Sequence, residues 1–510
     1  MQIPDAAVLR TGRRQVKGYD YKDNRYPIYA LFIQDSWRAR RRLNLELGLR
    51  WEPFVPYWDK KDRLAVWRPG RQSTRFRSAP PGVLFAGDPG IPRGGFETAW
   101  KNIGPRLGLA WDVFGDGRTS LRAGYGIFFD RMNIIMTNSQ ANQAPFATTV
   151  VVYGNMQNSF RDPYAGMVNP FPAPLDPPGD FRFILPHTAF LYEEHMANPY
   201  LQAWNLTLER EFRGGVLGRI AYAGSKGTRL TIGREMNPAI YRPGATTADT
   251  NQRRPLYPLL AGVTLVEPVG NSTFHSLQLT AERRLRAGFS VLANYMWSKS
   301  IDDATANKIT GQNRSNPFSQ RFDKGPSDFD HTHVVTVSGL WAIPGSYQHR
   351  LARWLLGGWK TNFILSLQTG APYTIYSGVD NARSGTPTTG AAGQRADLVG
   401  NPYLSEGRSR GEKILRWLNP DAFAPNALGT FGNQGRNMWR MPGLANVDAG
   451  LHKDFPLAEQ IKLTFRFEAF NVFNRVNLGA PDSNRSSGNF NRISSAFDPR
   501  ILQLALRLAW

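Results

Sequence analysis

The 510-residue sequence predicts an all-β protein, an antiparallel β-barrel that spans a membrane, and three observations support this fold class. Apolar and polar residues alternate with a period of two in segments spread along the whole chain. Aromatic residues recur near the ends of the apolar rows, as in the interfacial girdles of a barrel. The links between the segments alternate between short and long, which is the pattern of periplasmic turns and extracellular loops.

The alternation is clearest at the C-terminus, where Leu502, Leu504, Leu506, Leu508 and Trp510 share one face and polar or small residues share the other. The same pattern recurs upstream with more noise. It predicts 13 strands, near residues 27–38, 42–54, 104–114, 119–130, 198–213, 216–225, 272–286, 287–300, 331–344, 358–370, 445–455, 459–475 and 499–510. A barrel strand needs about 10 residues and exposes only alternate ones to lipid, so a mean hydropathy of −0.40 is compatible with a membrane protein.

Each strand taken alone also fits a soluble sandwich, propeller or lectin. The polar face, however, carries Arg, Lys and Glu as often as Thr or Gly, which suits a wet lumen. The long links are 55–103, 131–197, 226–271, 301–330, 371–444 and 476–498, and a soluble sandwich has no reason to separate its loops by parity. The links therefore favour the membrane barrel.

The strand count predicts that this barrel is incomplete. Thirteen is odd, whereas barrels made of one bacterial chain have an even number of strands with both ends in the periplasm. We therefore expect a fragment, or a chain that needs a partner, because unpaired strand edges are not tolerated in hydrocarbon. We expect residues 1–26 to be a lead-in, either a loop or a truncated strand, and residues 27–510 to be the C-terminal part of the barrel. The first 15 residues contain no apolar core of a signal peptide.

Seven segments resemble TonB-dependent receptors of the Oar-like family, in the order in which that family has them. They are NPYLQAWNLTLEREF (198–212), FHSLQLTAERRL (274–285), ANYMWSKSIDD (293–303), FDHTHVVTVSGLWAIP (329–344), GGWKTNFILSLQTGAPYT (357–374), FGNQGRNMWRMPGLANVDAGLHKDF (431–455) and FEAFNVFNRVNLGAP (467–481). The resemblance implies a barrel of about 22 strands, of which this chain is roughly the last 13. It also implies an N-terminal carboxypeptidase-regulatory-like domain, a plug and a TonB box, none of which we find in the sequence.

What the resemblance implies about function is energy-coupled uptake of a nutrient across the outer membrane, with the TonB complex acting through the plug. A passive porin or an adhesin-like barrel is the first alternative, and a soluble β-rich carbohydrate-binding protein is the second. The final ILQLALRLAW resembles the β-signal that the barrel-assembly machinery reads, with Leu502, Leu504, Leu506, Leu508 and Trp510 as its apolar row.

The net charge of +22 raises nucleic acid or an anionic surface as a partner. No helix-turn-helix, RNP or zinc-finger pattern accompanies the charge, so we expect membrane lipid and lipopolysaccharide as partners and no nucleic acid. We expect no enzyme activity, because the sequence has no GxSxG, HExxH or P-loop motif.

Ligand contacts are expected in the long links 131–197 and 371–444, where aromatic, amide and carboxylate groups suit a carbohydrate or a peptide. The alternative is that these are packed or mobile loops without a specific ligand, and no individual substrate-binding residue can be named. Donor type alone suggests a metal site in FDKGPSDFDHTH, which contains Asp323, Asp328, Asp330, His331 and His333, with Asp302 and Asp303 a weaker candidate. Their spacing fits neither an EF-hand nor a zinc motif, so we expect no metal and no cofactor.

Overall fold

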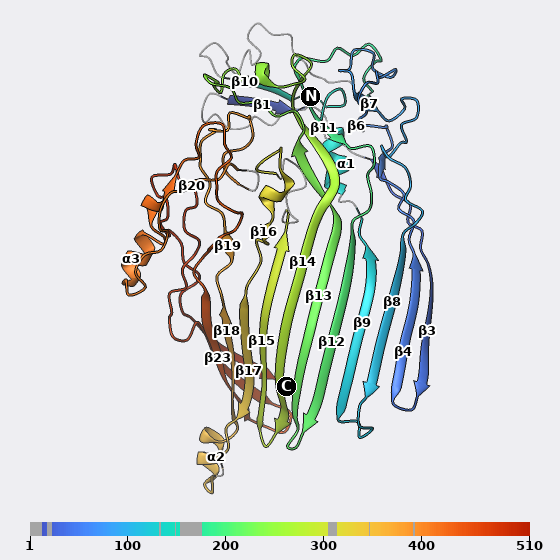
Figure 1. Cartoon of the computed structure of the whole chain (residues 1–510). Coiled ribbons are helices and arrows are strands. Elements are labelled where there is room, and N and C mark those ends of the chain that lie inside the picture. Colours follow the sequence, from blue (N-terminus) through green and yellow to red (C-terminus); the bar gives the residue numbers. More distant parts are fainter. Residues whose placement is uncertain are drawn as a thin grey trace.

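A computed structural model describes residues 13–17, 23–131, 134–147, 149–153, 176–303, 314–345, 347–390 and 393–510. Its main feature is one curved antiparallel sheet in which long strands follow one another in chain order (Figure 1). These strands are β3 (Leu31–Arg40), β4 (Leu43–Trp51), β8 (Ile103–Asp112), β9 (Thr119–Phe129), β12 (Tyr200–Phe212), β13 (Val216–Glu235), β14 (Leu260–Arg286), β15 (Phe289–Asp302), β17 (His333–Ala342), β18 (Trp359–Gln368), β23 (Leu444–Pro456), β24 (Lys462–Phe470) and β25 (Ile501–Ala509). All 13 predicted strands are present in the predicted order, which confirms the fold class.

The register brings the apolar rows of neighbouring strands together on one face of this sheet. Leu47 of β4 lies opposite Leu107 of β8, which in turn lies opposite Tyr125 of β9. At the other edge, Leu504 of β25 lies opposite Phe467 of β24. Leu504 is 70% exposed, so this face carries large apolar side chains outward rather than into a core.

The two ends of the sheet differ as the link lengths predict. Short links lie at the lower end in Figure 1, and the long links gather at the upper end. The C-terminus lies toward the lower end. One lower link, between β17 and β18, carries a short helix, α2 (Arg350–Leu356). Among the 13 long strands, β3 and β25 each have one paired neighbour, so this row of described strands has two free edges.

Two strands are longer than predicted. β13 continues to Glu235 and β14 begins at Leu260, beyond the expected ranges 216–225 and 272–286. The upper part of β14 pairs in parallel with β11 (His187–Tyr192), which meets β6 (Ala65–Trp67). Val263 and Val266 are fully buried there, and a strand buried on both faces has no two-residue period to detect.

The long links fold with these strand ends into an upper assembly, defined as the described residues of 52–102, 130–199, 236–259, 303–332, 369–443 and 471–500 with the upper ends of β13 and β14. Its shorter elements are β1 (Arg13–Lys17) with β10 (Thr149–Tyr153), β2 (Asn24–Arg25) with β5 (Trp58–Asp59), β7 (Val83–Phe85), β16 (Gly325–Pro326), β19 (Pro372–Tyr373) with β22 (Trp439–Arg440), β20 (Asp397–Leu398) with β21 (Phe423–Ala424), α1 (Ile134–Ala141) and α3 (Arg410–Leu415). No helix in the described part of the chain is both long and apolar enough to cross a bilayer.

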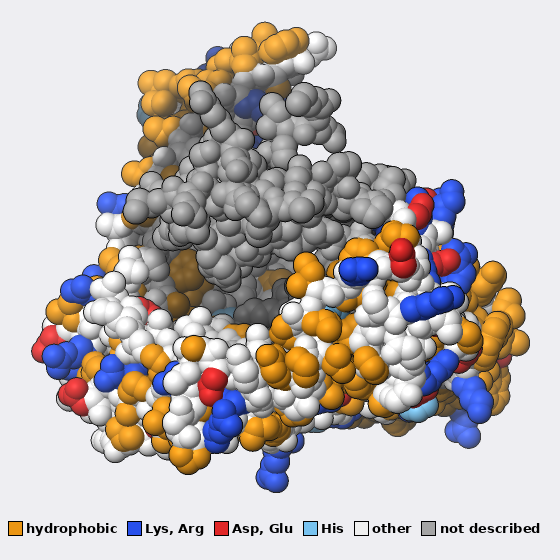
Figure 2. Space-filling view, turned by 90° about the horizontal axis from the view of Figure 1, so that it is seen from above, with side chains coloured by type: hydrophobic (Ala, Val, Ile, Leu, Met, Phe, Trp, Pro, Cys, Tyr) orange, Lys and Arg blue, Asp and Glu red, His pale blue; other side chains and the backbone are white. Residues whose placement is uncertain are grey.

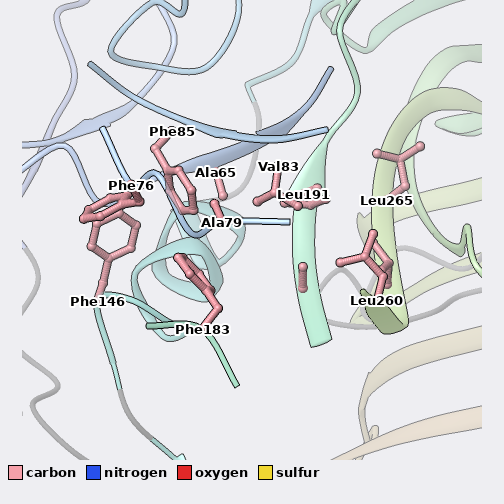
Figure 3. Close-up of a cluster of buried hydrophobic side chains, with 12 residues drawn as sticks. Ala65, Phe76, Ala79, Val83, Phe85, Phe146, Phe183, Leu191, Leu260 and Leu265 are labelled. Carbon is pink, nitrogen blue, oxygen red and sulfur yellow. The ribbon is translucent and has the colours of Figure 1, made fainter. Parts of the chain in front are cut away.

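Buried apolar clusters stabilise the upper assembly. In one of them, Phe76 packs edge-to-face against Phe85, with ring centroids 4.9 Å apart at an interplanar angle of 83°. Figure 3 shows Phe146 and Phe183 beside them, with Leu191 of β11 and Leu260 of β14 on the other side of the cluster. A further cluster combines the segments around Tyr373, Phe423 and Trp439. The described parts of the long links are therefore largely folded structure with cores of their own.

Candidate functional site

The inner face of the sheet is lined by polar side chains that bond across strands. Arg219 and Glu209 form an ion pair of 2.7 Å, and the Thr280 hydroxyl donates to Asn294 Oδ1 at 2.9 Å. The Thr464 hydroxyl donates to Asp454 Oδ1 at 2.8 Å. Paired polar groups of both charges suit a water-filled lumen.

The outer face carries aromatic side chains near the upper end of the apolar rows. Trp51 stacks on Trp100 with ring centroids 6.3 Å apart, and its Nε1 donates to the Trp100 carbonyl at 2.7 Å. Tyr222 hydrogen-bonds to His275 Nδ1 at 2.7 Å. The Tyr295 hydroxyl lies 2.9 Å from Nδ1 of His333. His333, considered above for metal binding, thus belongs to this outward row of rings.

Residues 8–503 match the family model described as an outer membrane beta barrel domain. The chain belongs to this family. It is therefore an integral protein of the outer membrane, with its apolar face toward lipid, its short links in the periplasm and its upper assembly outside the cell. Membership excludes the soluble carbohydrate-binding alternative.

Several solved outer-membrane proteins are similar to this barrel. The outer membrane transporter YddB from Escherichia coli has 12% identity and a TM-score of 0.49, over 97% of this chain and 50% of that chain. The ferric enterobactin receptor of Pseudomonas aeruginosa has 12% identity and a TM-score of 0.44, over 98% and 49%. The ferripyoverdine receptor of the same species has 11% identity and a TM-score of 0.43, over 97% and 38%. The chain thus spans half or less of each of these proteins. No curated protein matches the sequence.

The acidic residues considered for metal binding are held by arginines of the 371–444 link. We name three ion pairs the arginine staples: Asp302–Arg436, Asp323–Arg395 and Asp330–Arg440. The three carboxylate side chains are between 1% and 4% exposed. Since burial of a charge costs free energy unless the charge is paired, each staple needs both of its partners.

Further bonds complete this junction between wall and loop. Asp330 Oδ1 accepts from the Ser300 N–H at 2.6 Å, and Asp328 Oδ1 accepts from Asn437 Nδ2 at 2.7 Å. His331 Nδ1 lies 2.6 Å from the Thr369 carbonyl, and Asp303 Oδ2 accepts from the Asn271 N–H at 3.0 Å. Among the described residues no group of three or more His, Asp or Glu side chains is placed to hold a metal ion. The acidic segment joins the 371–444 link to the barrel wall.

Burial and pairing act against each other on the pKa values of the most buried staple. Burial raises the pKa of Asp323, and the adjacent Arg395 guanidinium opposes that rise. For Arg395 the direction is reversed: burial lowers the pKa of the guanidinium, and the Asp323 carboxylate opposes that decrease. Loss of either partner would leave a charge almost completely removed from water.

Two more carboxylates order the link between β4 and β8. Asp59 receives two hydrogen bonds from Arg63, at 2.8 and 2.7 Å. Burial alone would raise the pKa of Asp59, but these bonds and backbone N–H donors outweigh burial and lower it. Asp88 accepts from the backbone N–H groups of Thr74, Arg75 and Phe85 within 2.8 Å, and the pKa of Asp88 is likewise lowered although burial opposes this. The hydrogen bonds of Asp59 and Asp88 therefore hold the link between β4 and β8 in one defined conformation.

The expected ligand loops are in large part packed. In NARSGTPTTG (381–390), Ala382, Ser384 and Thr386 are buried. The buried amide of Gln394 accepts from the Ala382 N–H at 2.8 Å and donates to Asp380 Oδ1 at 2.6 Å. Residues 169–175 of the Pro-rich segment lie outside the described residues, and Phe183 at its end belongs to an apolar core. These described parts are packed, and whether the two links contact a ligand stays a prediction.

Residues missed by the sequence analysis, above all Gln394 and Arg395, lie within this packed loop. A Gln-Arg pair in a long link has no distinctive spacing, and only the fold brings Arg395 to Asp323, 72 positions away. The apolar row Leu502, Leu504, Leu506 and Leu508 lies outward on β25, an edge strand. Trp510 is 89% exposed, and the role of this row as an assembly signal stays a prediction.

Proposed function

We propose that the chain is the barrel portion of a TonB-dependent receptor that takes up a nutrient across the outer membrane. Two of the arginine staples, Asp302–Arg436 and Asp330–Arg440, carry the proposal, because they lie in the segments that resemble the Oar-like family. ANYMWSKSIDD supplies Asp302, FDHTHVVTVSGLWAIP supplies Asp330, and the segment 431–455 supplies Arg436 and Arg440. The resemblance thus coincides with the contacts that hold an ordered extracellular assembly above a polar lumen.

The arrangement suits capture followed by passage. The upper assembly offers a defined surface outside the cell, and the polar inner face of the sheet leads from it toward the periplasm. Figure 2 views the molecule from the extracellular side, and Lys and Arg side chains project along its margin among hydrophobic ones. We propose a carbohydrate or peptide ligand and assign no catalytic step to the chain.

Energy coupling requires parts beyond the described sheet. The free edges of β3 and β25 expose unpaired backbone groups, which hydrocarbon does not tolerate. We propose that further strands of a longer receptor close the barrel and that a plug connects it to TonB.

Uptake in the native host tests this proposal. A deletion of the gene should abolish growth on one oligosaccharide or peptide source, and a deletion of tonB should produce the same defect. Planar-bilayer recordings of the full-length protein should show no open conductance. Steady conductance together with TonB-independent uptake would support a passive porin instead.

A further inference from the structure

A pocket opens on the outward face of the wall, at the level where apolar strands meet the upper assembly. Its floor is formed by side chains of β9 and β12, including Phe129, Tyr200 and Gln202. The register places this row on the same face as Leu121 and Leu208, so the floor faces away from the lumen. Residues 98–102 and 196–198 form the rest of its lining, and its volume is about 590 Å³.

The lining combines aromatic rings with cations and contains no carboxylate. Phe129 and Tyr200 lie with ring centroids 5.9 Å apart, and Arg229 lies over the Tyr200 ring at 6.0 Å. Trp100 contributes a third ring and is 60% exposed. Lys101 and Arg229 are exposed, and neither forms an ion pair with any described residue. The pocket therefore carries two uncompensated positive charges beside ring faces.

Two buried amides leave hydrogen-bonding atoms unused in this lining. Asn102 and Asn198 are 7% and 5% exposed, and Asn102 Nδ2 and Asn198 Oδ1 have no partner among the described residues. Asn198 Nδ2 donates to the Asp130 carbonyl at 3.3 Å, which orients that amide. Buried polar atoms are normally paired, so an unused donor and an unused acceptor on two lining residues suit a ligand that supplies both.

We propose that this pocket binds the phosphorylated sugar head group of a glycolipid in the outer leaflet. Sugar hydroxyls both donate and accept, as Asn102 and Asn198 require, and ring faces suit the apolar face of a saccharide. Lys101 and Arg229 match a phosphate through charge-assisted hydrogen bonds. The outward position at the upper end of the apolar band places the pocket where lipid head groups lie, which favours a lipid-linked sugar over a free one.

Lipid retention by the full-length protein tests the proposal. The double variant Lys101→Gln/Arg229→Gln is compared with Arg41→Gln/Arg213→Gln, which removes two exposed charges at the lower turns. After extraction from the outer membrane in mild detergent, native mass spectrometry measures the bound lipopolysaccharide. The pocket variant should retain about tenfold less than the wild type, and the control should match the wild type.

Titration of the purified protein distinguishes a lipid-linked sugar phosphate from a free one. The probes are deep-rough lipopolysaccharide, its dephosphorylated form and free glucosamine 6-phosphate. Binding should weaken about tenfold on dephosphorylation, and the free sugar phosphate should compete only at far higher concentration. Equal affinity for the free sugar phosphate would overturn the lipid assignment. Equal retention by the pocket variant, folded as judged by heat-modifiable mobility, would overturn the site.

Discussion

In the barrel wall, large apolar side chains such as Leu504 and Leu506 lie on the surface, whereas in the upper assembly Phe76 and Phe85 are almost completely buried. The wall places its apolar groups in lipid and its polar groups in water. Most of the upper assembly stands in water above the bilayer, so it needs closed cores and paired buried charges like a soluble domain. The two regions of the chain are thus adapted to two different solvents, lipid and water. The same substitution should therefore change stability differently in the two regions.

The largest effect is expected at the end of the wall, on assembly rather than on stability. Deletion of Trp510, which is 89% exposed, removes few contacts from the folded protein. If the terminal row is the assembly signal, the deletion should leave unfolded precursor in the periplasm. Pulse-chase fractionation with heat-modifiable mobility measures this, and Phe497→Ala, another exposed aromatic, is the control. Normal assembly of the deletion variant would exclude the signal role of Trp510.

In the upper assembly, Asp323→Ala should cost about 3–5 kcal/mol, because it leaves the buried Arg395 without its counter-charge. Hydrogen exchange and limited proteolysis of residues 371–444 should show the loss, while the wall keeps its heat-modifiable mobility. Asp421→Ala, at an exposed position of the same link, should have little effect.

A second variant distinguishes the effect of an unpaired buried charge from a general loss of packing at the Asp323–Arg395 staple. Asp323→Leu combined with Arg395→Met removes both charges and should recover most of the protection, since an apolar pair replaces a buried ion pair at little cost. If Asp323→Ala leaves proteolysis unchanged, the staple does not hold the link.

In the wall, Leu208→Arg should destabilise the protein by about 2–4 kcal/mol, because Leu208 lies deeper in the apolar band than the aromatic row of Tyr222. Leu208 lies in the outward row opposite Leu121 and Ile220. Thr207→Arg, one residue away on the lumen face, should change stability far less, because water reaches that face. Urea unfolding in lipid vesicles, followed by tryptophan fluorescence, compares the two, and equal losses would contradict the assignment of the faces.

The smallest effect concerns pH and should be confined to the upper assembly. Burial lowers the pKa of His187 to about 4, and its ring packs against Phe183 with centroids 5.1 Å apart. Below an unfolded-state pKa near 6.5 only the unfolded chain takes up the proton, so stability is complete above that pH and falls as the pH drops toward 4. Between pH 7 and pH 5 the loss should be about 2 kcal/mol.

Hydrogen exchange of β11 at the two pH values measures this loss. His187→Leu should remove most of the difference in exchange protection between pH 7 and pH 5. An unchanged pH dependence in that variant would assign the effect to other groups.

The contrast between the regions also explains what the sequence could predict. The strands near 42–54 and 499–510 were found because lipid on one side and water on the other impose a two-residue period on each of them. The upper part of β14 was missed because Val263 and Val266 are buried on a strand covered from both faces. The staples were missed because Asp323 and Arg395 are neighbours only in the folded protein. From residue type alone, Asp323 resembled a metal ligand and Arg395 resembled an ordinary loop charge.

The arginine staples have a consequence for how such outer-membrane barrels can be re-engineered or can diverge. Asp302 and Asp330 belong to one link with its flanking strands, whereas Arg436 and Arg440 belong to another. Grafting the 371–444 link alone onto a barrel that lacks acidic residues at the positions of Asp302 and Asp330 would bring its arginines without their counter-charges. A chimera should therefore function only when the 371–444 link is transferred together with the segment that carries Asp302 and Asp330. We expect these two segments to be inherited together.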